Sequence, residues 1–357
     1  MEIAKLNFKD FRNYRNLTLE LNPKVNIFIG DNAQGKTNLL EGIYLSSLGK
    51  SFRTSKDTEM IRFEAPFFRV EVTALKDGER LTVEIALSED QKAIKIDGVK
   101  ALKSSELLQH IYTVIFSPED LKIVKDEPEK RRRFIDREIS LLKPSYLRNL
   151  ASYKKALAQR NALLKEKKVK DDALEVWDKS LSNYAEPIIT DREEYVKKLE
   201  EISRKIHYDL SEGKEDLRII YERGMEGNLY EALKHSIRID RLRGTTTKGP
   251  HRDDLKLLVN GKDLRSFGSQ GQQRTAALAL KLSELKLIKE ETKEEGILLL
   301  DDVLSELDSR RQKYLINTLK DVQVFITSAE LSEELKSMLS KGNVYKVTQG
   351  EVVLQND

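Results

Sequence analysis

A glycine-rich run of eight residues extends from Gly30 to Thr37, near the N-terminus. It fits the pattern G-x-x-x-x-G-K-[ST] and follows a short apolar stretch, Val25–Ile29, which predicts a strand. Glycines allow backbone N–H groups to turn inward around phosphate oxygens, and the N-terminus of the next helix adds the positive end of its dipole. We therefore expect a phosphate-binding loop made of Gly30, Asp31, Asn32, Ala33, Gln34, Gly35, Lys36 and Thr37.

A pair of acidic residues far along the chain completes this chemistry. Asp301 and Asp302 follow Ile297–Leu300, four apolar residues of a predicted buried strand. Thr37 and Asp301 are the expected Mg²⁺ ligands, because hydroxyl and carboxylate oxygens suit this ion. Lys36 adds a positive charge for the β- and γ-phosphate oxygens, and Asp302 is placed to orient or deprotonate an attacking water. The sequence thus predicts a nucleotide site in which Lys36 and Asp302 are catalytic.

The elements that must position these residues alternate between strand and helix. A helix is expected at 35–48, and the acidic pair is followed by a helix at 309–319 and a strand at 322–327. This alternation predicts parallel strands with ligands at their carboxyl ends. Further strands are expected at 2–8, 15–21, 67–74, 81–88, 92–97, 111–116 and 255–259, and a further helix at 270–290.

The middle of the chain differs in character. Residues 117–210 are strongly charged and have a helical period, with breaks expected at Pro128, Pro144 and Pro187. We predict an α/β fold, in which a lobe of mixed sheets with flanking helices is split by an inserted, mainly helical second lobe. The expected ranges are 1–116 for the N-terminal half of the first lobe, 117–245 for the insertion and 246–357 for the C-terminal half.

Composition excludes several classes of protein. The 357 residues include no cysteine, which excludes disulfides, thiolate zinc sites and cysteine nucleophiles. The N-terminus is charged where a signal peptide needs an apolar run, and no apolar stretch has the length of a membrane span. We expect a soluble, cytoplasmic protein with no membrane partner.

Charge is distributed unevenly, although the net charge is only +3. Residues 121–170 contain 16 Lys and Arg against 6 Asp and Glu, a net charge of +10, whereas residues 171–220 contain 8 against 14, a net charge of −6. Basic side chains of this kind bind DNA phosphates without reading the base sequence. The candidate DNA contacts are Lys130, Arg131, Arg132, Arg133, Lys154 and Lys155. The alternatives are that these residues form a solvated helix face, pair with the acidic segment, or contact the nucleotide lobe or a protein partner. A second basic cluster, with the same alternatives, consists of Arg238, Arg241, Arg243 and Lys248.

A polar run precedes the acidic strand. Phe267–Gln273 stands at the predicted start of a helix and is similar to the signature motif of ABC-type ATPases. In that class, serine and glycine of the motif contact the γ-phosphate of ATP bound to a second subunit. The similarity implies that Ser269, Gln270 and Gly271 bind ATP, with a catalytic role for Ser269. Ser305–Asp308 resembles the D-loop of the same class. A plain helix cap by Ser269 is the alternative interpretation.

The ordered set of motifs resembles the RecF family of bacterial recombination-mediator ATPases, which is related to SMC-type proteins. The resemblance covers essentially the whole chain. Its elements are Phe11–Tyr14, the phosphate-binding loop, Phe116–Leu121, Arg131–Phe134, Gly249–Asp254, the signature-like run, and Leu299–Asp302 with the D-loop.

The resemblance implies an ABC-type P-loop ATPase with ATP and Mg²⁺ as ligands. It also implies an ATP-dependent homodimer that binds double-stranded, gapped or junction DNA and acts with RecR and RecO in loading RecA. Arg12 and Asn13 would then reach the nucleotide, a solvent-facing turn being the alternative. His251 is expected to be structural or switch-like rather than catalytic.

Two departures from the wider ABC pattern predict slow hydrolysis that serves as a switch. Asp302 stands where a glutamate is usual, and Thr327-Ser328 stands where a switch histidine is expected. An acid that is one methylene shorter positions water less well, and a misplacement of about 1 Å can cost ~100-fold in rate. Two other functions remain as alternatives: the nucleotide-binding subunit of a membrane transporter, and a non-hydrolysing scaffold that ATP switches.

Overall fold

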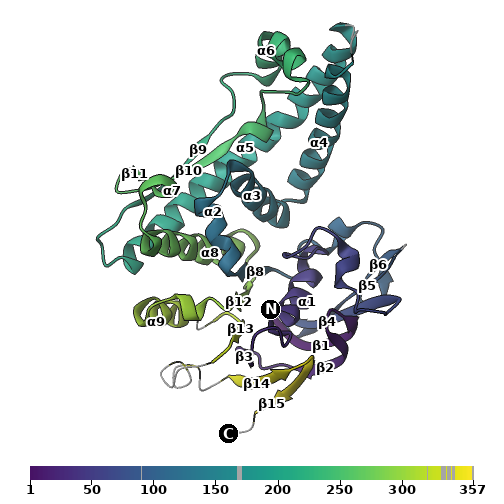
Figure 1. The fold of residues 1–357 in the computed structure, drawn as a ribbon, viewed down its shortest axis with the longest axis vertical. Coiled ribbons are helices and arrows are strands. Elements are labelled where there is room, and N and C mark those ends of the chain that lie inside the picture. The colour runs from purple at the N-terminus through teal and green to yellow at the C-terminus, as the bar shows by residue number, and fades with distance from the viewer. Residues whose placement is uncertain are drawn as a thin grey trace. The chain divides into compact units, whose positions relative to one another are not determined.

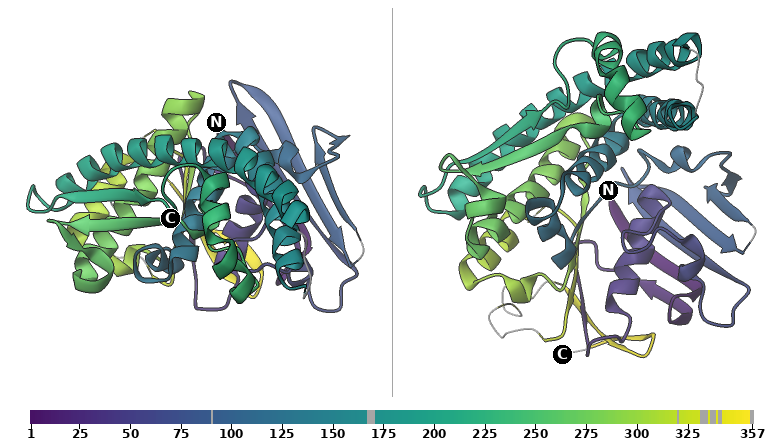
Figure 2. Two further views of the ribbon diagram at one scale, coloured as in Figure 1. Left: turned by 90° about the horizontal axis from the view of Figure 1, so that it is seen from above. Right: turned by 45° about the horizontal axis from the view of Figure 1, so that its top comes forward.

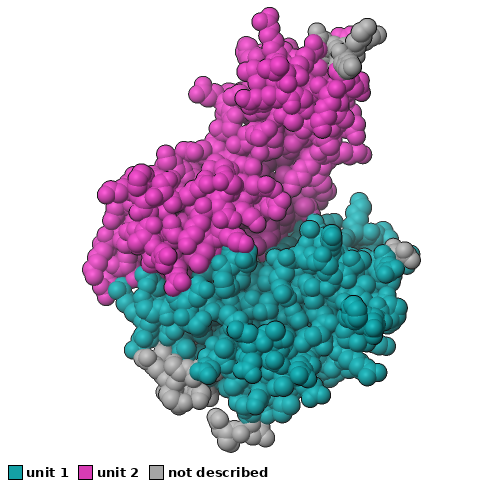
Figure 3. All heavy atoms as spheres, viewed as in Figure 1, with its two compact units in different colours: residues 1–120, 284–357 teal, residues 121–283 magenta. Residues whose placement is uncertain are grey.

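The computed structural model describes residues 1–89, 91–166, 171–319, 321–330, 335, 339 and 342–355. The chain divides into two compact units, unit 1 with residues 1–120 and 284–357, and unit 2 with residues 121–283 (Figure 3). The phosphate-binding loop and the acidic pair belong to unit 1, whereas the signature-like run and the candidate DNA contacts belong to unit 2. Residues 167–170 of the basic stretch lie outside the described residues.

One sheet of unit 1 contains the strand before the phosphate-binding loop and the strand that ends at Asp301 (Figure 1). Its strand order is β15-β14-β3-β13-β12-β8, parallel except for the antiparallel edge strand β15. The strands are β3 (Val25–Ile29), β8 (Thr113–Phe116), β12 (Ile297–Asp301), β13 (Val324–Ser328), β14 (Asn343–Thr348) and β15 (Glu351–Leu354). Only β13 separates β3 from β12, so the loop after β3 and the acids at the end of β12 meet at the same edge of the sheet.

The second sheet of unit 1 is antiparallel, with the order β2-β1-β4-β5-β6-β7. It consists of β1 (Glu2–Phe11), β2 (Tyr14–Glu20), β4 (Phe67–Lys76), β5 (Glu79–Ser88), β6 (Lys92–Ile96) and β7 (Val99–Lys100). Helix α1 (Lys36–Leu48) contacts strands of both sheets, and its Leu39, Leu40 and Ile43 join Phe8 and Phe68 in one core. Because α1 is covered on almost every side, its sequence shows no polar face.

Unit 2 combines helices with a small antiparallel sheet (Figures 1 and 2). Its helices are α2 (Leu121–Lys125), α3 (Pro128–Leu142), α4 (Pro144–Leu164), α5 (Asp171–Leu210), α6 (Leu229–Arg243), α7 (Leu264–Phe267) and the first part of α8 (Gln270–Thr292). The sheet has the order β11-β10-β9 and is formed by β9 (Leu217–Glu222), β10 (Asp254–Val259) and β11 (Lys262–Asp263). Helix α5 lies beside α4 and packs on β9. None of the helices in the described part of the chain combines the length and apolar character that a membrane span requires.

The expected alternation of parallel strands and helices is confirmed, and the helix predicted at 309–319 is α9 (Ser309–Thr318). Pro128 and Pro144 each stand in the first turn of a helix, where the missing N–H is not needed. The break expected at Pro187 is wrong, because this proline lies inside α5. Ile188 and Ile189 beside it are buried, so packing of this part of α5 outweighs the roughly 3 kcal/mol that an interior proline costs.

The boundaries between the compact units differ from the ranges expected from the sequence. They fall at 120/121 and 283/284, whereas the expected ranges divide at 116/117 and 245/246. The second difference arises because β10 pairs with β9 along its whole length and thereby belongs to unit 2. The signature-like run at the start of α8 is grouped with it. Which ranges act together as an ATPase lobe stays a prediction.

Candidate nucleotide-binding site

The phosphate-binding loop connects β3 to α1 in unit 1. Lys36 is the first residue of α1, and its Nζ donates hydrogen bonds to the backbone oxygens of Gly30 and Asp31, at 2.7 and 2.9 Å. The Lys36 side chain therefore crosses from the end of the loop to its first two residues. The first turn of α1 contains no acidic side chain, which leaves the positive end of the helix dipole available to an anion. Backbone N–H groups, ammonium and dipole together make this loop suitable for phosphate oxygens.

Two positions of the loop require glycine. Gly35 has a φ of 115°, and a Cβ there would lie 2.5 Å from Asn13 Nδ2. A Cβ at Gly30 would lie 2.3 Å from the backbone oxygen of Val347 in β14. The neighbour of Gly30 is backbone, which leaves no room for a side chain, and at Gly35 the positive φ favours glycine in addition to the close Asn13 amide.

Thr37 and Asp301 meet at the carboxyl edge of the parallel sheet. Thr37 Oγ1 donates to Asp301 Oδ1 at 2.8 Å, and Thr327 Oγ1 of β13 donates to the same oxygen at 2.9 Å. Burial raises the pKa of the Asp301 carboxyl above its ordinary value, and the two hydroxyl hydrogen bonds offset part of that rise.

The donor atoms at this edge fit Mg²⁺. A hydroxyl and a carboxylate oxygen side by side are the ligands that this ion prefers, together with water and substrate phosphates. Over the residues that the structure describes, no group of three or more His, Asp or Glu side chains is arranged to hold a metal ion by protein ligands alone. Thr37 and Asp301 would thus supply the protein's part of a metal site shared with a nucleotide.

Asp302 follows Asp301 in an unusual backbone conformation. Its φ is 54°, in the left-handed region, and its N–H donates to the backbone oxygen and Oγ1 of Thr327, at 3.2 and 3.0 Å. Aspartate is one of the few residues that tolerate this region. The turn therefore favours the shorter acid over glutamate at this position.

Arg12 and Asn13 form the turn between β1 and β2. Arg12 donates two hydrogen bonds to the buried carboxylate of Glu41 in α1, at 2.6 and 2.8 Å, and its side chain is 16% exposed. Asn13 Nδ2 donates to the backbone oxygen of Gln34 at 2.8 Å. The alternative of a solvent-facing turn is therefore wrong for both residues. Asn13 supports the phosphate-binding loop from outside, and a direct contact of either residue with the nucleotide stays a prediction.

Sequence reasoning missed Glu41 and Arg53. Arg53 NH1 donates to Asn38 Oδ1 at 2.6 Å and lies 3.4 Å from Glu41 Oε2. Burial raises the pKa of Asp301, and the charge of Arg53 offsets a small part of that rise, so a second cation besides Lys36 acts on this site. The available signal was Glu41 itself, the one acid in the sequence of α1, because a buried acid needs a cationic partner.

The β14–β15 hairpin braces the loop from another side. The N–H of Gly350 donates to the backbone oxygen of Gln34 at 3.1 Å, and the N–H of Gln349 donates to Gln34 Oε1 at 2.7 Å. Gly350 has a φ of 83°, and a Cβ there would lie 2.5 Å from the backbone oxygen of Asn13. The hairpin and the turn at Asn13 therefore both pack closely against the phosphate-binding loop and against each other.

The signature-like run forms the N-terminus of α8, in unit 2. The N–H of Gln272 donates to Ser269 Oγ at 3.2 Å, and Gln272 Oε1 accepts from the N–H of Ser269 at 2.9 Å. This is a capping box, so the helix-cap interpretation of Ser269 describes its present contacts. Ser269 and Gln270 are nevertheless exposed, and Gly271 is half-buried. An exposed helix N-terminus with a hydroxyl group is suited to an anion that another molecule carries.

Comparison with known proteins identifies the family. The family model described as RecF/RecN/SMC N terminal domain matches residues 2–352. A protein named DNA replication and repair protein RecF, from Lachnoclostridium phytofermentans, is 44% identical over 99% of both chains. The chain belongs to the RecF family. A second RecF protein, from Clostridioides difficile, is 43% identical over 99% of this chain and 98% of its own.

Solved structures agree with this assignment. A structure described as the recombination mediator protein RecF with ATP in the RecFOR pathway is 38% identical, has a TM-score of 0.91, and covers 99% of this chain and 98% of its own. An Smc head domain from Pyrococcus furiosus, 18% identical with a TM-score of 0.58, matches 99% of this chain and 96% of its own and shows a likeness of fold alone. The predicted fold, an ABC-type α/β ATPase lobe with a mainly helical second lobe, is confirmed, as is the resemblance to the RecF family.

The candidate DNA contacts of this RecF-family chain differ in burial. Arg131 is only 4% exposed, and its Nε and NH2 donate to the two carboxylate oxygens of Asp254, at 2.7 and 2.9 Å. Arg132 is half-buried, and its NH1 donates to the backbone oxygen of Asp253 at 2.7 Å. Arg131 therefore serves the interior of unit 2, and we do not retain it as a DNA contact.

The exposed members are Lys130, Arg133, Lys154 and Lys155. Arg133 pairs with Glu129 one turn away on α3, an exposed contact of the kind that contributes little to stability. Lys154 Nζ lies 4.0 Å from Asp136 Oδ2, and Asp136 is one helical turn beyond Arg133. Arg133 and Lys154 therefore belong to one surface of α3 and α4. The four exposed residues and the half-buried Arg132 stay predicted DNA contacts.

His251 belongs to a buried polar network in the same unit. Tyr153 OH lies 2.7 Å from its Nδ1, and the backbone oxygen of Thr246 lies 2.9 Å from its Nε2. Burial lowers the pKa of His251 to about 4, so the imidazole is neutral at neutral pH. Nearby, buried Arg192 donates to Pro250 O at 2.7 Å and to Asp253 Oδ2 at 2.9 Å. The network thus supports the structural interpretation of His251.

Proposed function

We propose that the protein is an ATP-dependent DNA-binding protein of recombinational repair and replication restart. Two copies dimerise on binding ATP, clamp duplex, gapped or junction DNA and, together with RecR and RecO, promote the loading of RecA at gaps. Slow, DNA-stimulated hydrolysis then separates the copies. The supporting observation is that Lys36, Thr37 and Asp301 converge at one sheet edge in a chain that a RecF–ATP structure matches over 99% of its length. The proposed place of action is the cytoplasm.

Each nucleotide-site residue of unit 1 has a defined task in this proposal. Lys36 exchanges its hydrogen bonds to backbone oxygens for bonds to phosphate oxygens, which carry more negative charge. Thr37 and Asp301 hold Mg²⁺, which neutralises charge on the phosphates. Asp302, next to the metal ligand, orients the attacking water.

The signature-like run completes the site in trans. Ser269, Gln270 and Gly271 of one copy face the nucleotide of the other, with the hydroxyl and backbone N–H groups of the helix N-terminus toward the γ-phosphate. Because the two copies are identical, the interface is two-fold symmetric and contains two ATP molecules. ATP then acts as the link between the copies, and its loss opens the dimer.

Two features of the geometry support the proposal of slow hydrolysis. The left-handed turn at position 302 favours aspartate, whose carboxylate reaches less far than that of glutamate. Thr327 stands in the place of a switch histidine, and it uses its hydroxyl on Asp301 and on the N–H of Asp302. A hydroxyl cannot take up a proton as an imidazole does at neutral pH. Both features favour slow hydrolysis that limits the lifetime of the dimer over rapid, repeated turnover.

DNA binding by fluorescence anisotropy tests the proposal. We expect tight binding to gapped duplex DNA with a non-hydrolysable ATP analogue and weak binding with ADP. Replacing Lys130, Arg133, Lys154 and Lys155 by alanine is expected to lower the slope of log affinity against log salt by about 0.9 for each phosphate that the protein no longer neutralises. The control with the same charge change replaces four exposed basic residues of unit 1, Lys9, Lys24, Arg80 and Lys100.

The outcomes separate the alternatives. Binding that is equally tight with ADP would contradict the ATP switch. An unchanged salt slope in the four-residue variant would move the DNA surface to Arg238, Arg241, Arg243 and Lys248. Absence of phosphate release in the presence of DNA would favour the non-hydrolysing scaffold. The transporter alternative is not favoured, because the relatives are named as DNA replication and repair proteins.

A further inference from the structure

One acidic side chain links the start of α8 to the end of α5. Gln272 Nε2 donates to Glu215 Oε1 at 2.9 Å, and Glu215 Oε2 lies 3.0 Å from His207 Nε2. His207 is fully buried near the end of α5, whereas the Glu215 side chain is 22% exposed. All three residues belong to unit 2, so this chain of contacts is internal to one compact unit.

Gln272 is also the residue that shapes the signature-like run. Its backbone N–H is bound by Ser269 Oγ, and its side-chain oxygen accepts from the N–H of Ser269. The planar amide of Gln272 therefore has its oxygen on Ser269 and its nitrogen on Glu215. Fixing one end of this rigid group fixes the other, so the carboxylate of Glu215 determines the conformation on which the cap depends.

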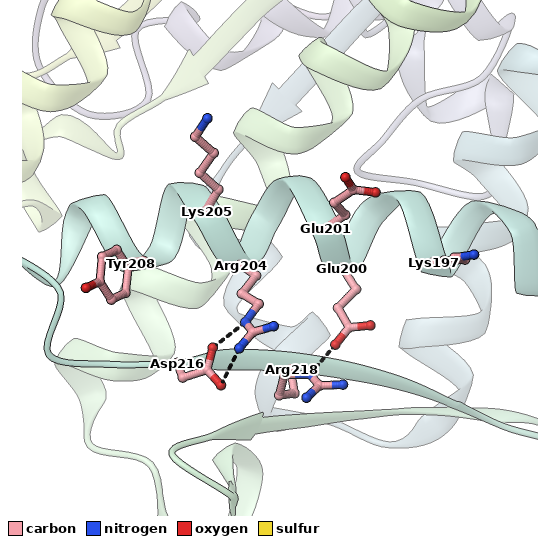
Figure 4. A pocket seen from close by; sticks show the side chains of 8 residues that line it. All are labelled: Lys197, Glu200, Glu201, Arg204, Lys205, Tyr208, Asp216 and Arg218. Carbon is pink, nitrogen blue, oxygen red and sulfur yellow. Dashed lines mark hydrogen bonds and ion pairs between the residues drawn. The ribbon is translucent and has the colours of Figure 1, made fainter.

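Glu215 is itself held in place by a clamped turn. Its N–H donates to Ser211 Oγ at 3.2 Å. The next residue, Asp216, is bound by Arg204 of α5, with NH2 and Oδ2 3.1 Å apart, and its N–H donates to Asn260 Oδ1 at 2.8 Å. Figure 4 shows the Arg204–Asp216 pair in a surface pocket that residues of α5 and β9 line. These contacts hold the backbone at Glu215 in place, so its carboxylate reaches Gln272 from a fixed position.

We propose that Glu215 is a positioning residue for the ATP-dependent dimer. It holds Gln272 so that Ser269 and the N-terminus of α8 are presented in one conformation to the nucleotide of a second copy. The inference rests on the proposed function and deepens it, because it assigns a role in association to a residue outside every nucleotide-binding motif. Preorganisation of this kind lowers the ordering cost of association. Binding of ATP to unit 1 of the same copy does not involve Glu215.

The test exchanges the amide and the carboxylate. Gln272→Glu places two carboxylates against each other and removes the hydrogen bond between them. In the double variant Glu215→Gln/Gln272→Glu, an amide again meets a carboxylate with donor and acceptor exchanged, and an oxygen remains for His207. With a non-hydrolysable ATP analogue, we expect the dimer dissociation constant to rise about 100-fold in Gln272→Glu, tenfold for each of two equivalent contacts. In the double variant it returns to within about threefold of wild type.

Three measurements accompany the exchange. Sedimentation over a concentration series gives the dissociation constants, a fluorescent ATP analogue gives the nucleotide affinity of the monomer, and thermal unfolding reports the fold. Glu212→Gln, which removes one negative charge from the same turn as Glu215, is the control and is expected to dimerise like wild type. Glu215→Asp keeps the charge but shortens the reach to Gln272, and it is expected to weaken association without changing nucleotide affinity.

The possible results are distinguishable. A dimer that forms normally in Gln272→Glu, or a double variant that associates no better than Gln272→Glu, would overturn the role of Glu215. So would an equal effect of Glu212→Gln. A wild-type protein that stays monomeric with the analogue and DNA would instead overturn the proposed function, and this inference with it.

Discussion

The acid that ends β12 and the acid that follows it differ in their surroundings, and we predict separate tasks for them. Asp301 is buried, and hydroxyl groups of Thr37 and Thr327 bind one of its oxygens. Asp302 is half-buried and starts from a left-handed backbone conformation. We therefore expect the first acid to serve as a metal ligand and the second to orient the attacking water. Two substitutions separate these tasks.

Asp302→Glu is expected to raise the rate of ATP hydrolysis. The longer side chain restores the reach that the shorter acid lacks, and we predict an increase of about tenfold in kcat with KM unchanged. The left-handed turn opposes glutamate, so a stability loss of up to about 1 kcal/mol should accompany the gain. Phosphate release in the presence of DNA measures the rate, with Asp302→Asn as the inactive control. A kcat at or below that of wild type would contradict this role of side-chain length.

Asp301→Asn is expected to stabilise the nucleotide-free protein while abolishing Mg²⁺-dependent hydrolysis. Burial raises the pKa of Asp301, so its negative charge costs folding free energy at neutral pH. Removing the charge should raise the free energy of unfolding at pH 7. The difference should shrink as the pH falls through the raised pKa, because the wild-type carboxyl then becomes neutral as well. Urea unfolding at a series of pH values measures it. A difference that grows toward low pH would have the wrong sign for a buried carboxylate.

Among the secondary-structure elements, two that lie far from the phosphate-binding loop in sequence hold it in place. The β1–β2 turn contributes Asn13, and the β14–β15 hairpin contributes the N–H groups of Gln349 and Gly350. Both bind Gln34 in the middle of the loop. The conformation of the loop therefore depends on elements at both ends of the chain.

Gly350→Ala is expected to weaken ATP binding about tenfold. The new Cβ would lie 2.5 Å from the backbone oxygen of Asn13, so the hairpin must move away from Gln34. Gly78→Ala is the matched control, since Gly78 has a similar φ of 84° and nothing within 4 Å of its added Cβ. Titration with a fluorescent ATP analogue measures the affinity. Equal affinities in the two variants would show that the hairpin does not support the loop.

Elements with local cues were predictable from the sequence. The loop at Gly30–Thr37 and the apolar strand before Asp301 are each identified by a few neighbouring residues. Strands β9, β14 and β15 were missed, because each is short and mixes polar with apolar residues. The helix through Pro187 was missed because packing, which no local rule contains, decides its course.

The residues of the candidate site also divide into those that local sequence cues identify and those that only the fold brings together. Lys36, Thr37 and Asp301 were predicted, because a known spacing and a strand end identify them. The contacts of Gln34 with Gly350 and of Glu41 with Arg12 join residues far apart in sequence, and only the fold reveals them. Arg131 carries the same charge as its neighbours in the basic run, and burial against Asp254 alone distinguishes it.

For the molecule as a whole, the nucleotide-binding loop and the signature-like run lie in different compact units. Ser269 is exposed, and its present contacts are those of a helix cap. In the proposed dimer, each copy supplies a complete phosphate-binding loop to its own ATP and a signature-like run to the other. ATP would thereby convert two separate DNA-binding molecules into one clamp.

The mass of the protein in solution is the measurement to make first. Light scattering with ADP and with a non-hydrolysable ATP analogue plus Mg²⁺ should show a monomer in the first case and a dimer in the second. Ser269→Arg, which places a large cation at the start of α8, should bind the analogue but stay monomeric. Ser145→Arg, the same change at an exposed position of α4, should behave like wild type. A monomer with the analogue even when DNA is added, or a Ser269→Arg variant that dimerises normally, would contradict the ATP-linked clamp.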